Sequence, residues 1–304
     1  MATQDRKTDW IHKSVLLQEM VKGLDIEEGG VIVDCTLNTG GHSELVLSLY
    51  PSVRVIGVDM DSEAIAKARA RLAEYGNRFE AFKSNFRNLD KVLEDAGVDQ
   101  VSGFMFDLGW SSDQLELSGR GFSFQRDEPL LMTYEAHPKD DVTARMIVNE
   151  WGEDTIETLI KNYGEEDHAT RIAKAIVEAR KTKPIETTGE LREIIWNAVP
   201  PYYRNHKIHP ATKTFQALRI TVNDEFGALK EALRKAYDHT QKESRIAVIS
   251  FHSSEDRIVK EWSKELAKQG QALLITKKPI APTAKEIKSN PRARSAKLRI
   301  IQKI

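Results

Sequence analysis

The chain has 304 residues, of which 40% are hydrophobic and 30% are charged, and its formal net charge is −1. These values are typical of a globular protein with one large or two ordinary domains, and no apolar run approaches the roughly 20 residues of a membrane helix. The single cysteine, Cys35, excludes a disulfide framework and argues against a Cys-based zinc site. The first ten residues are polar and carry no signal-peptide core. We therefore expect a cytoplasmic protein without a membrane segment or a bound metal.

The first third of the chain alternates between predicted strands and helices. Strands are predicted from Val31 onward and at residues 53–59, 79–82 and 103–108, and helices at residues 14–24, from Leu45 onward and at 62–73. Each strand runs into polar or small residues. Because the carboxyl ends of parallel strands share one edge of a doubly wound sheet, this pattern predicts an α/β fold with a cofactor crevice at that edge.

The pattern changes after Gln114. A glycine-containing loop at residues 119–130 precedes a helical region at 143–199. Helices then follow at 214–223 and 225–237, a strand at 245–251, and a hairpin of 272–276 with 297–302. We predict a first domain segment at residues 1–115, an inserted helical substrate-recognition domain at 116–212, and a second segment of the first domain at 213–304.

The turn after the first strand, TLNTGGH, has the character of a ligand-holding loop. Gly40 and Gly41 permit positive φ and a close backbone approach, and a helix beginning there presents free N–H groups to a polar ligand. Asp59 ends the second strand near the spacing at which a carboxylate accepts hydrogen bonds from a ribose diol. The turn lacks the G-x-G-x-x-G spacing that seats a pyrophosphate, which argues against a nicotinamide dinucleotide.

S-adenosylmethionine satisfies the same pattern without a phosphate. Its ribose diol suits Asp59, its adenine suits Asn85 and Phe86, and its positively charged sulfonium favours nearby carboxylates such as Asp34 and Asp107. The residues alone thus favour a methyltransferase over a dehydrogenase.

Several long motifs resemble the RsmH/MraW family of 16S ribosomal RNA cytosine-N4 methyltransferases. They are HKSVLL at 12–17, VDCTLNTGGHS at 33–43, DLGWSSDQL at 107–115, RGFSF at 120–124, YGEE at 163–166, HPATKTFQALRI at 209–220, SFHSSEDRIVK at 250–260 and NPRARSAKLR at 290–299. The resemblance implies a class I S-adenosylmethionine-dependent methyltransferase domain, a Rossmann-like doubly wound sheet with a C-terminal antiparallel hairpin, interrupted by an all-helical insertion. It implies a decoding-centre cytidine near the peptidyl site as substrate. The cofactor positions it implies are Gly40, Gly41, His42, Asp59, Phe86, Asp107 and Gln114, to which the turn residue Asn38 is added.

The chemistry of such a reaction requires positioning more than covalent help. The exocyclic amine of cytosine is a poor nucleophile because its lone pair is delocalised into the ring. We expect Asp107 to accept a hydrogen bond from this amine or to orient the cofactor. The secondary candidates for contact with the base are Trp110, by stacking, and Ser111, Ser112 and His252. Each has a structural alternative: a packing tryptophan, helix caps, or a hydrogen-bonded wall histidine.

Substrate RNA is expected to meet basic side chains and loop aromatics. Arg204 and Lys213 lie in a stretch without acidic residues, and Arg292 and Arg294 lie in a basic C-terminal run. Arg120 and Phe122 stand in the loop after the sheet motifs. A solvated charged face is the alternative for both basic stretches. The expected partner is 16S ribosomal RNA or the small ribosomal subunit, and a homodimer stays open.

Some positions depart from the family pattern. Asn38 stands where the family has glycine. At 129–135 the sequence PLLMTYE replaces P-L-D-M-R-M-D, so the residues that differ from the family pattern are Leu131, Thr133, Tyr134 and Glu135. Ser254 replaces a leucine. Because these changes concentrate on the substrate side, a divergent paralogue acting on another RNA position, or a cofactor-binding protein without catalysis, remains an alternative. A dehydrogenase is the more distant one.

Overall fold

The computed structural model describes residues 14–27, 29–109, 118–134 and 142–304. The chain forms two compact units, residues 1–109 with 228–304 and residues 110–227. The predicted domain boundaries lie after residues 115 and 212, whereas the units divide after residues 109 and 227. The difference at the second boundary is larger because α11 (Ala211–Asn223) packs against α7, α6 and α9 of the second unit.

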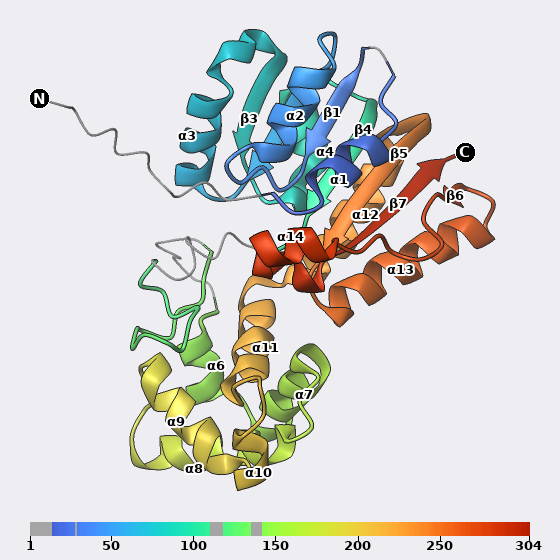
Figure 1. Ribbon diagram of the computed structural model, residues 1–304. Coiled ribbons are helices and arrows are strands. Elements are labelled where there is room, and N and C mark those ends of the chain that lie inside the picture. Colours follow the sequence, from blue (N-terminus) through green and yellow to red (C-terminus); the bar gives the residue numbers. More distant parts are fainter. Residues whose placement is uncertain (1–13, 28, 110–117, 135–141) are drawn as a thin grey trace, which may run out of the picture. The chain divides into compact units, whose positions relative to one another are not determined.

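The first unit is built on a seven-stranded sheet in the order β3-β2-β1-β4-β5-β7-β6 (Figure 1). The strands are β1 (Val31–Asp34), β2 (Arg54–Asp59), β3 (Phe79–Lys83), β4 (Val101–Asp107), β5 (Thr240–Ser250), β6 (Ala272–Leu274) and β7 (Lys297–Lys303). The pairs from β3 to β5 are parallel, and β7 runs antiparallel between β5 and β6. This order with a reversed β7 is the class I methyltransferase sheet, so the predicted fold class is confirmed for this unit.

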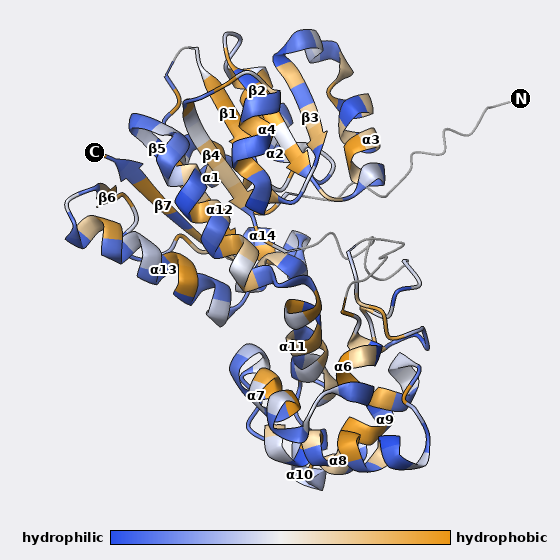
Figure 2. Ribbon diagram, turned by 180° about the vertical axis from the view of Figure 1, so that it is seen from behind, coloured by the Kyte–Doolittle hydropathy of each residue, from blue (hydrophilic) through white to orange (hydrophobic). Residues whose placement is uncertain are grey.

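Alternating side chains of the strands enter two separate apolar layers. Val33 belongs to the layer covered by α4, α12 and α13, whereas Ile32 belongs to the layer covered by α1, α2 and η3. Buried apolar side chains therefore cover both faces of the sheet. In Figure 2 the strands β1, β2 and β4 carry much orange. The helices are α1 (Leu17–Gly23), α2 (Gly41–Leu49), α3 (Ser62–Arg71), α4 (Leu89–Asp95), α12 (Glu225–His239), α13 (Ser253–Lys268) and α14 (Ala284–Ser289), with short 3₁₀ turns η1 (Ala73–Arg78), η2 (Phe86–Asn88) and η3 (Pro291–Ser295).

The second unit is helical in its described part and has its own core. Its helices are α6 (Ala144–Glu150), α7 (Glu153–Gly164), α8 (Ala169–Thr182), α9 (Thr188–Ala198), α10 (Pro201–Arg204) and α11. Thr187 and Glu190 form a capping box at the start of α9, which satisfies backbone N–H groups that the helix itself leaves unpaired. Ile147, Ile160, Ile172 and Leu218 are fully buried in this core.

Two element starts differ from the predicted ones. Helix α2 begins at Gly41 rather than near Leu45, because Gly40 ends the turn in the left-handed conformation, with φ 78°, and the helix follows at once. Strand β5 begins at Thr240, five residues before the predicted start at residue 245. Among the described residues, no helix is long and apolar enough to cross a membrane.

Candidate cofactor site

The glycine turn joins β1 to α2 through two residues in left-handed backbone geometry, Asn38 with φ 49° and Gly40 with φ 78°. The turn is anchored to the neighbouring strand because the Leu37 amide donates to the Val58 carbonyl at 3.0 Å. Gly41 leaves no room for a side chain, since a Cβ there would stand 2.1 Å from Ser14 Oγ. The chain segment before α1 therefore occupies part of the space that the glycine pair leaves open.

Asp59 fastens this turn to the end of β2. Its Oδ2 accepts the Asn38 amide at 2.8 Å, and its Oδ1 accepts the Asp61 amide at 2.9 Å. Burial raises the pKa of Asp59 above its usual value, while these backbone donors work in the opposite direction. A carboxylate offers about four lone-pair sites, so Asp59 can still accept from a ligand such as a ribose diol.

Asp34 lies at the end of β1 and is fully buried. It accepts a hydrogen bond from Ser43 Oγ at 2.7 Å and one from the Thr36 amide at 3.3 Å. Burial raises the pKa of Asp34 to about 6, and the charge of Asp59 adds to this increase. Asp34 therefore ties β1 to α2 and carries a carboxyl group that titrates near neutral pH.

Asp107 ends β4 beside this pair. Its backbone N–H donates to Thr36 Oγ1 at 2.6 Å, and its Oδ2 lies 3.8 Å from Nδ1 of the buried His42. Within the described residues, the buried Oδ1 atom has no hydrogen-bond partner. Burial raises the pKa of Asp107 well above its usual value, and the charges of Asp34 and Glu255 raise it further.

His42 is oriented by the segment before α1. Its Nε2 lies 3.2 Å from the Val15 carbonyl, which can only accept, so this contact requires a proton on Nε2. With the proton on Nε2, the ring directs Nδ1 toward Asp107 Oδ2, 3.8 Å away.

These groups fit a cationic ligand with a sugar. A buried carboxylate oxygen without a partner is costly unless a ligand supplies a donor or a positive charge. Asp59 and the turn backbone offer polar contacts on the same strand edge. The site thus has the chemistry that a sulfonium cofactor requires.

The remaining predicted cofactor and catalytic residues differ in how they are held. Asn85 caps η2 by accepting the Arg87 amide at 2.9 Å, and Phe86 packs edge-on against Phe106 with ring centroids 6.2 Å apart. His252 caps α13, where its Nδ1 accepts the Glu255 amide at 3.4 Å and its Nε2 lies 3.0 Å from Glu255 Oε1. Trp110, Ser111, Ser112 and Gln114 lie outside the described residues.

The predicted RNA-contacting residues fall in both units. In the second unit, Arg120 donates to the Thr133 and Tyr134 carbonyls and lies over the Phe122 ring. Lys213 donates to the Glu165 carbonyl at 2.7 Å, which closes the end of α7.

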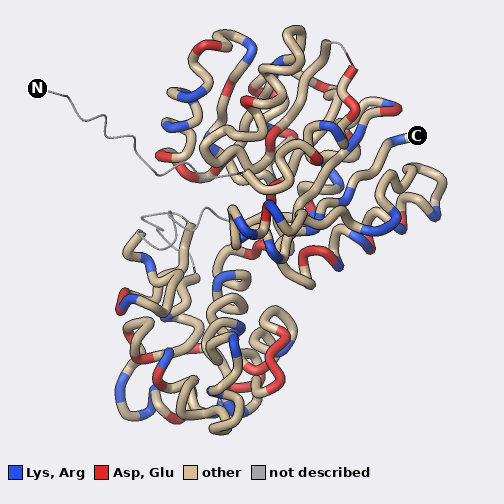
Figure 3. The backbone as a smooth tube through the Cα atoms, viewed as in Figure 1, with Lys and Arg blue, Asp and Glu red and all other residues tan. Residues whose placement is uncertain are grey.

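Arg204 lies over the Trp196 ring, 5.5 Å from its centroid. Arg292 and Arg294 are exposed on η3 of the first unit, where basic segments gather with those of α14 (Figure 3).

Thr36 and Ser43 are the site residues that the sequence reasoning missed. Both lie inside the VDCTLNTGGHS motif. The Thr36 hydroxyl accepts the backbone N–H of Asp107, and the Ser43 hydroxyl donates to the Asp34 carboxylate. Hydrogen bonds of this kind leave no periodic signal in a sequence. The sheet order, the turn and the three carboxylates together define a class I methyltransferase.

Comparison with known proteins agrees with this class. The chain matches the model of the MraW methylase family over residues 9–304, and it belongs to that family. It is 47% identical over 293 residues to a ribosomal RNA small subunit methyltransferase H of Persephonella marina, covering 96% of this chain and 99% of the relative. A protein of the same name from Clostridioides difficile is 44% identical over 309 residues, with 96% and 99% covered.

A crystal structure of a putative rRNA-methylase from Clostridium thermocellum also matches, with a TM-score of 0.47 and 15% identity over 97% of this chain and 100% of that one. As a methylase of this family, the chain uses S-adenosyl-L-methionine as its cofactor, which confirms the predicted donor and excludes the dehydrogenase alternative.

The left-handed turn residue can be tested directly. We expect Asn38→Gly to bind S-adenosylmethionine as the wild type does, because glycine adopts φ 49° without strain. Asn38→Val should weaken binding, because a β-branched residue is a genuine outlier at positive φ. Isothermal titration calorimetry measures both variants, and equal affinity of Asn38→Val would contradict the role of this conformation.

The raised pKa of Asp34 predicts a pH dependence of stability. A proton is held more tightly in the folded chain, so the free energy of unfolding falls as pH rises between the usual value of 3.8 and about 6, by about 3 kcal/mol from this group. Asp34→Asn should remove this contribution, whereas the exposed Asp95→Asn should not. Denaturant unfolding of the apoprotein at several pH values measures the difference, and parallel pH profiles for wild type and Asp34→Asn would refute it.

The buried carboxylates also predict charge discrimination between cofactor and product. S-adenosylmethionine carries a sulfonium cation and S-adenosylhomocysteine a neutral sulfur, so ionised Asp34 and Asp107 favour the former. We expect the Kd of S-adenosylhomocysteine divided by the Kd of S-adenosylmethionine to increase as pH rises through about 6. The increase should be about tenfold for each unit by which the bound cofactor lowers the pKa of Asp34. Calorimetry with both ligands measures the ratio, and a constant ratio in the wild type would rule out the electrostatic role.

Proposed function

We propose that the protein methylates N4 of a cytidine in 16S ribosomal RNA, at the decoding centre near the peptidyl site. Family membership and the names of its relatives support a small-subunit ribosomal RNA substrate. The single observation that carries the amine chemistry is Asp107, a buried carboxylate whose Oδ1 has no partner among the described residues. The bound cofactor supplies an electrophilic methyl group.

Asp107 is suited to orient an amine nucleophile. Its Oδ1 can accept one N–H of the cytosine amine, which fixes the orientation of the amine and raises the electron density on its nitrogen. Holding the amine in line contributes roughly 7 to 11 kcal/mol in favourable cases. Because burial raises the pKa of Asp107, its carboxylate is also a stronger base for the proton that the amine loses.

The target base must leave its stack to reach such a carboxylate. Flipping costs a few kcal/mol, and stacking on an aromatic ring returns about 1 to 3 kcal/mol. We propose Trp110 for this stacking and Ser111, Ser112 and His252 as further contacts to the base. Gln114 is proposed as a cofactor contact. Ribosomal RNA as substrate also supports a cytoplasmic location.

A second candidate is methylation of another RNA position. The departure at Tyr134 is built into the second unit, where its ring stacks on Phe122 with centroids 5.8 Å apart. Its hydroxyl donates to Glu225, which in turn pairs with Arg219 at 2.8 Å. Tyr134 thus orders the loop that carries Arg120 and Phe122. This favours a protein that contacts RNA differently over one that has lost its activity.

The activity is tested by methyl transfer to small ribosomal subunits, followed by nucleoside mass spectrometry. We expect N4-methylcytidine from the wild type, and a rate reduced about a hundredfold or more in Asp107→Asn, since that is the usual size of a proton-transfer contribution. The exposed Asp95→Asn is the matched control, and calorimetry with S-adenosylhomocysteine checks that the site is intact. Absence of N4-methylcytidine among the labelled products would contradict the proposal. A methyl group on another nucleoside would support the second candidate.

A further inference from the structure

The two central strands that carry Asp34 and Asp107 are joined differently at their ends. The register of β1 with β4 ends at Asp34 and Met105, and the Cys35 amide donates to the Met105 carbonyl at 2.9 Å. In a parallel ladder the next bond would run from the Asp107 amide to the Cys35 carbonyl. The Asp107 amide donates instead to Thr36 Oγ1, at 2.6 Å. A side-chain hydroxyl thus continues the ladder where the backbone of β1 turns away.

This hydrogen bond helps to fix where the Asp107 carboxylate stands. The next amide along β4, that of Leu108, donates to the Ile249 carbonyl of β5 at 2.9 Å. The end of β4 is therefore held toward β5 by a backbone bond and toward β1 by the Thr36 hydroxyl. Threonine has few χ1 rotamers, so its hydroxyl is well aimed. Because Asp107 is only 6% exposed, water has little access to replace a lost acceptor.

Thr36 belongs at the same time to the turn of the candidate cofactor site. Its backbone amide donates to Asp34 Oδ1 at 3.3 Å, and Ser43 Oγ of α2 donates to Asp34 Oδ2 at 2.7 Å. One residue therefore connects this turn with the end of β4. Its main chain serves the turn and its side chain serves Asp107, so a substitution can remove one connection and keep the other.

Such a connection matters because methyl transfer depends on alignment. The amine nitrogen and the methyl carbon must lie in line, about 3 to 3.5 Å apart, and a misplacement of about 1 Å can cost about a hundredfold in rate. The turn after β1 lies on the cofactor side of the reaction, and Asp107 at the end of β4 lies on the amine side. Their relative position sets the alignment of donor and acceptor.

We propose that Thr36 is a positioning residue for methyl transfer. Its hydroxyl fixes the Asp107 carboxylate relative to the cofactor turn, and so aligns the amine with the methyl group. The inference rests on the proposed function for the role of Asp107. Thr36 acts through Asp107 and requires no contact of its own with the RNA base.

The test compares Thr36→Val, which keeps the shape of the side chain but removes the acceptor, with Thr36→Ser, which keeps the hydroxyl. Methyl transfer to small ribosomal subunits gives kcat, and calorimetry gives the Kd of S-adenosylmethionine. We expect Thr36→Val to lower kcat about a hundredfold, the effect of a misplacement of about 1 Å. The Kd should stay at the wild-type value, because the backbone amide to Asp34 is retained. Thr36→Ser should restore most of the rate.

Thr276→Val is the matched control, because Thr276 Oγ1 accepts the Ile300 amide of β7 at 2.9 Å beside the edge strand of the same sheet. It loses the same kind of bond and should keep the wild-type kcat. Circular dichroism and thermal unfolding check the fold of each variant. If Thr36→Val does not fold, Thr36→Ala replaces it.

A double variant separates positioning from a general loss of structure. If Thr36 acts through Asp107, adding Thr36→Val to Asp107→Asn should slow the enzyme no further than Asp107→Asn alone, whereas independent effects would multiply. A multiplied loss would overturn the proposal. Wild-type kcat in Thr36→Val, or a Thr36→Ser variant as slow as Thr36→Val, would also overturn it.

A crystal structure of Thr36→Val tests the proposal without any activity. The Asp107 carboxylate should move by about 1 Å relative to the wild type, and an unmoved carboxylate would overturn the role of Thr36. Nucleoside mass spectrometry of the wild-type product decides the proposed function separately. A wild type that forms no N4-methylcytidine contradicts the proposed function, and the position of Asp107 in the variant still decides the role of Thr36.

Discussion

The burial of three carboxylates at one edge of a parallel sheet is the constraint on which the site depends. Asp34, Asp59 and Asp107 end three neighbouring strands, and like charges in a low-dielectric space oppose ionisation. Asp34 is stabilised by a hydroxyl and Asp59 by two backbone amides. Within the described parts of the chain, the Asp107 carboxylate has the long contact to His42 and no hydrogen-bond partner for Oδ1, so it is the carboxylate that gains most from a cation.

The same hydrogen bonds that satisfy the carboxylates also build the turn. The Asn38 amide donates to the Asp59 carboxylate, and the Thr36 amide donates to the Asp34 carboxylate. Cofactor affinity and local stability are therefore coupled, since loss of a carboxylate also releases the backbone that shapes the glycine turn. This coupling explains how asparagine can occupy the glycine position: its positive φ is held by bonds at both ends of the turn, including its side chain to the Thr36 carbonyl.

Sequence patterns predicted the parts of the fold that depend on local chemistry. Runs of β-branched residues such as Val31 to Val33 mark buried strands because both faces of the sheet are covered, and each of the seven strands overlaps a range that the sequence predicted. The short helices α4 and α14 and the longer α13 were not assigned. Of these, α13 begins at a histidine cap, which lies outside the usual cap residues.

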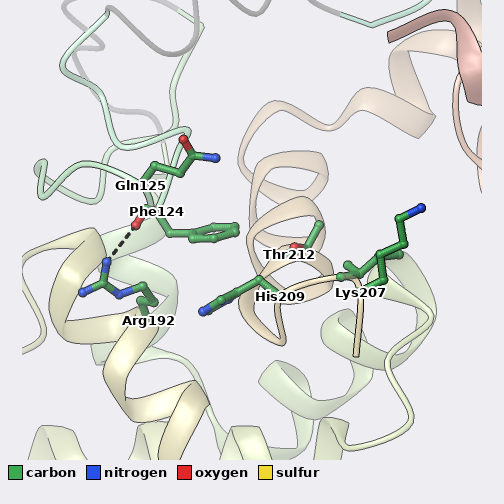
Figure 4. Close-up of a pocket in the computed structure, with 7 residues that line it drawn as sticks. Phe124, Gln125, Arg192, Lys207, His209 and Thr212 are labelled. Carbon is green, nitrogen blue, oxygen red and sulfur yellow. Dashed lines mark hydrogen bonds between the residues drawn. The ribbon is translucent and has the colours of Figure 1, made fainter. Parts of the chain in front are cut away.

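The pocket in the helical unit that Phe124, Arg192 and His209 help to line could not be predicted in this way (Figure 4). Phe124, Arg192 and His209 come from segments separated by many residues, and only the packing of the unit brings their rings and charges together. Conversely, Lys213 appears in the sequence as a free basic residue, although its ammonium group closes the end of α7. A run of cations shows net charge, but it does not show which cations have internal partners.

The burial of Asp107 also accounts for the direction of the proposed reaction. Before transfer, an ionised Asp107 is balanced by the positive charge of the bound donor. Transfer of the methyl group to the amine would remove the positive charge of the donor, and the amine nitrogen must then lose one proton. Because burial and the charges of Asp34 and Glu255 raise the pKa of Asp107, it can take that proton as the sulfonium charge disappears. The charge of Asp107 is therefore offset by the donor before transfer and by the transferred proton afterwards, so this buried carboxylate is not left as an unbalanced charge at either stage.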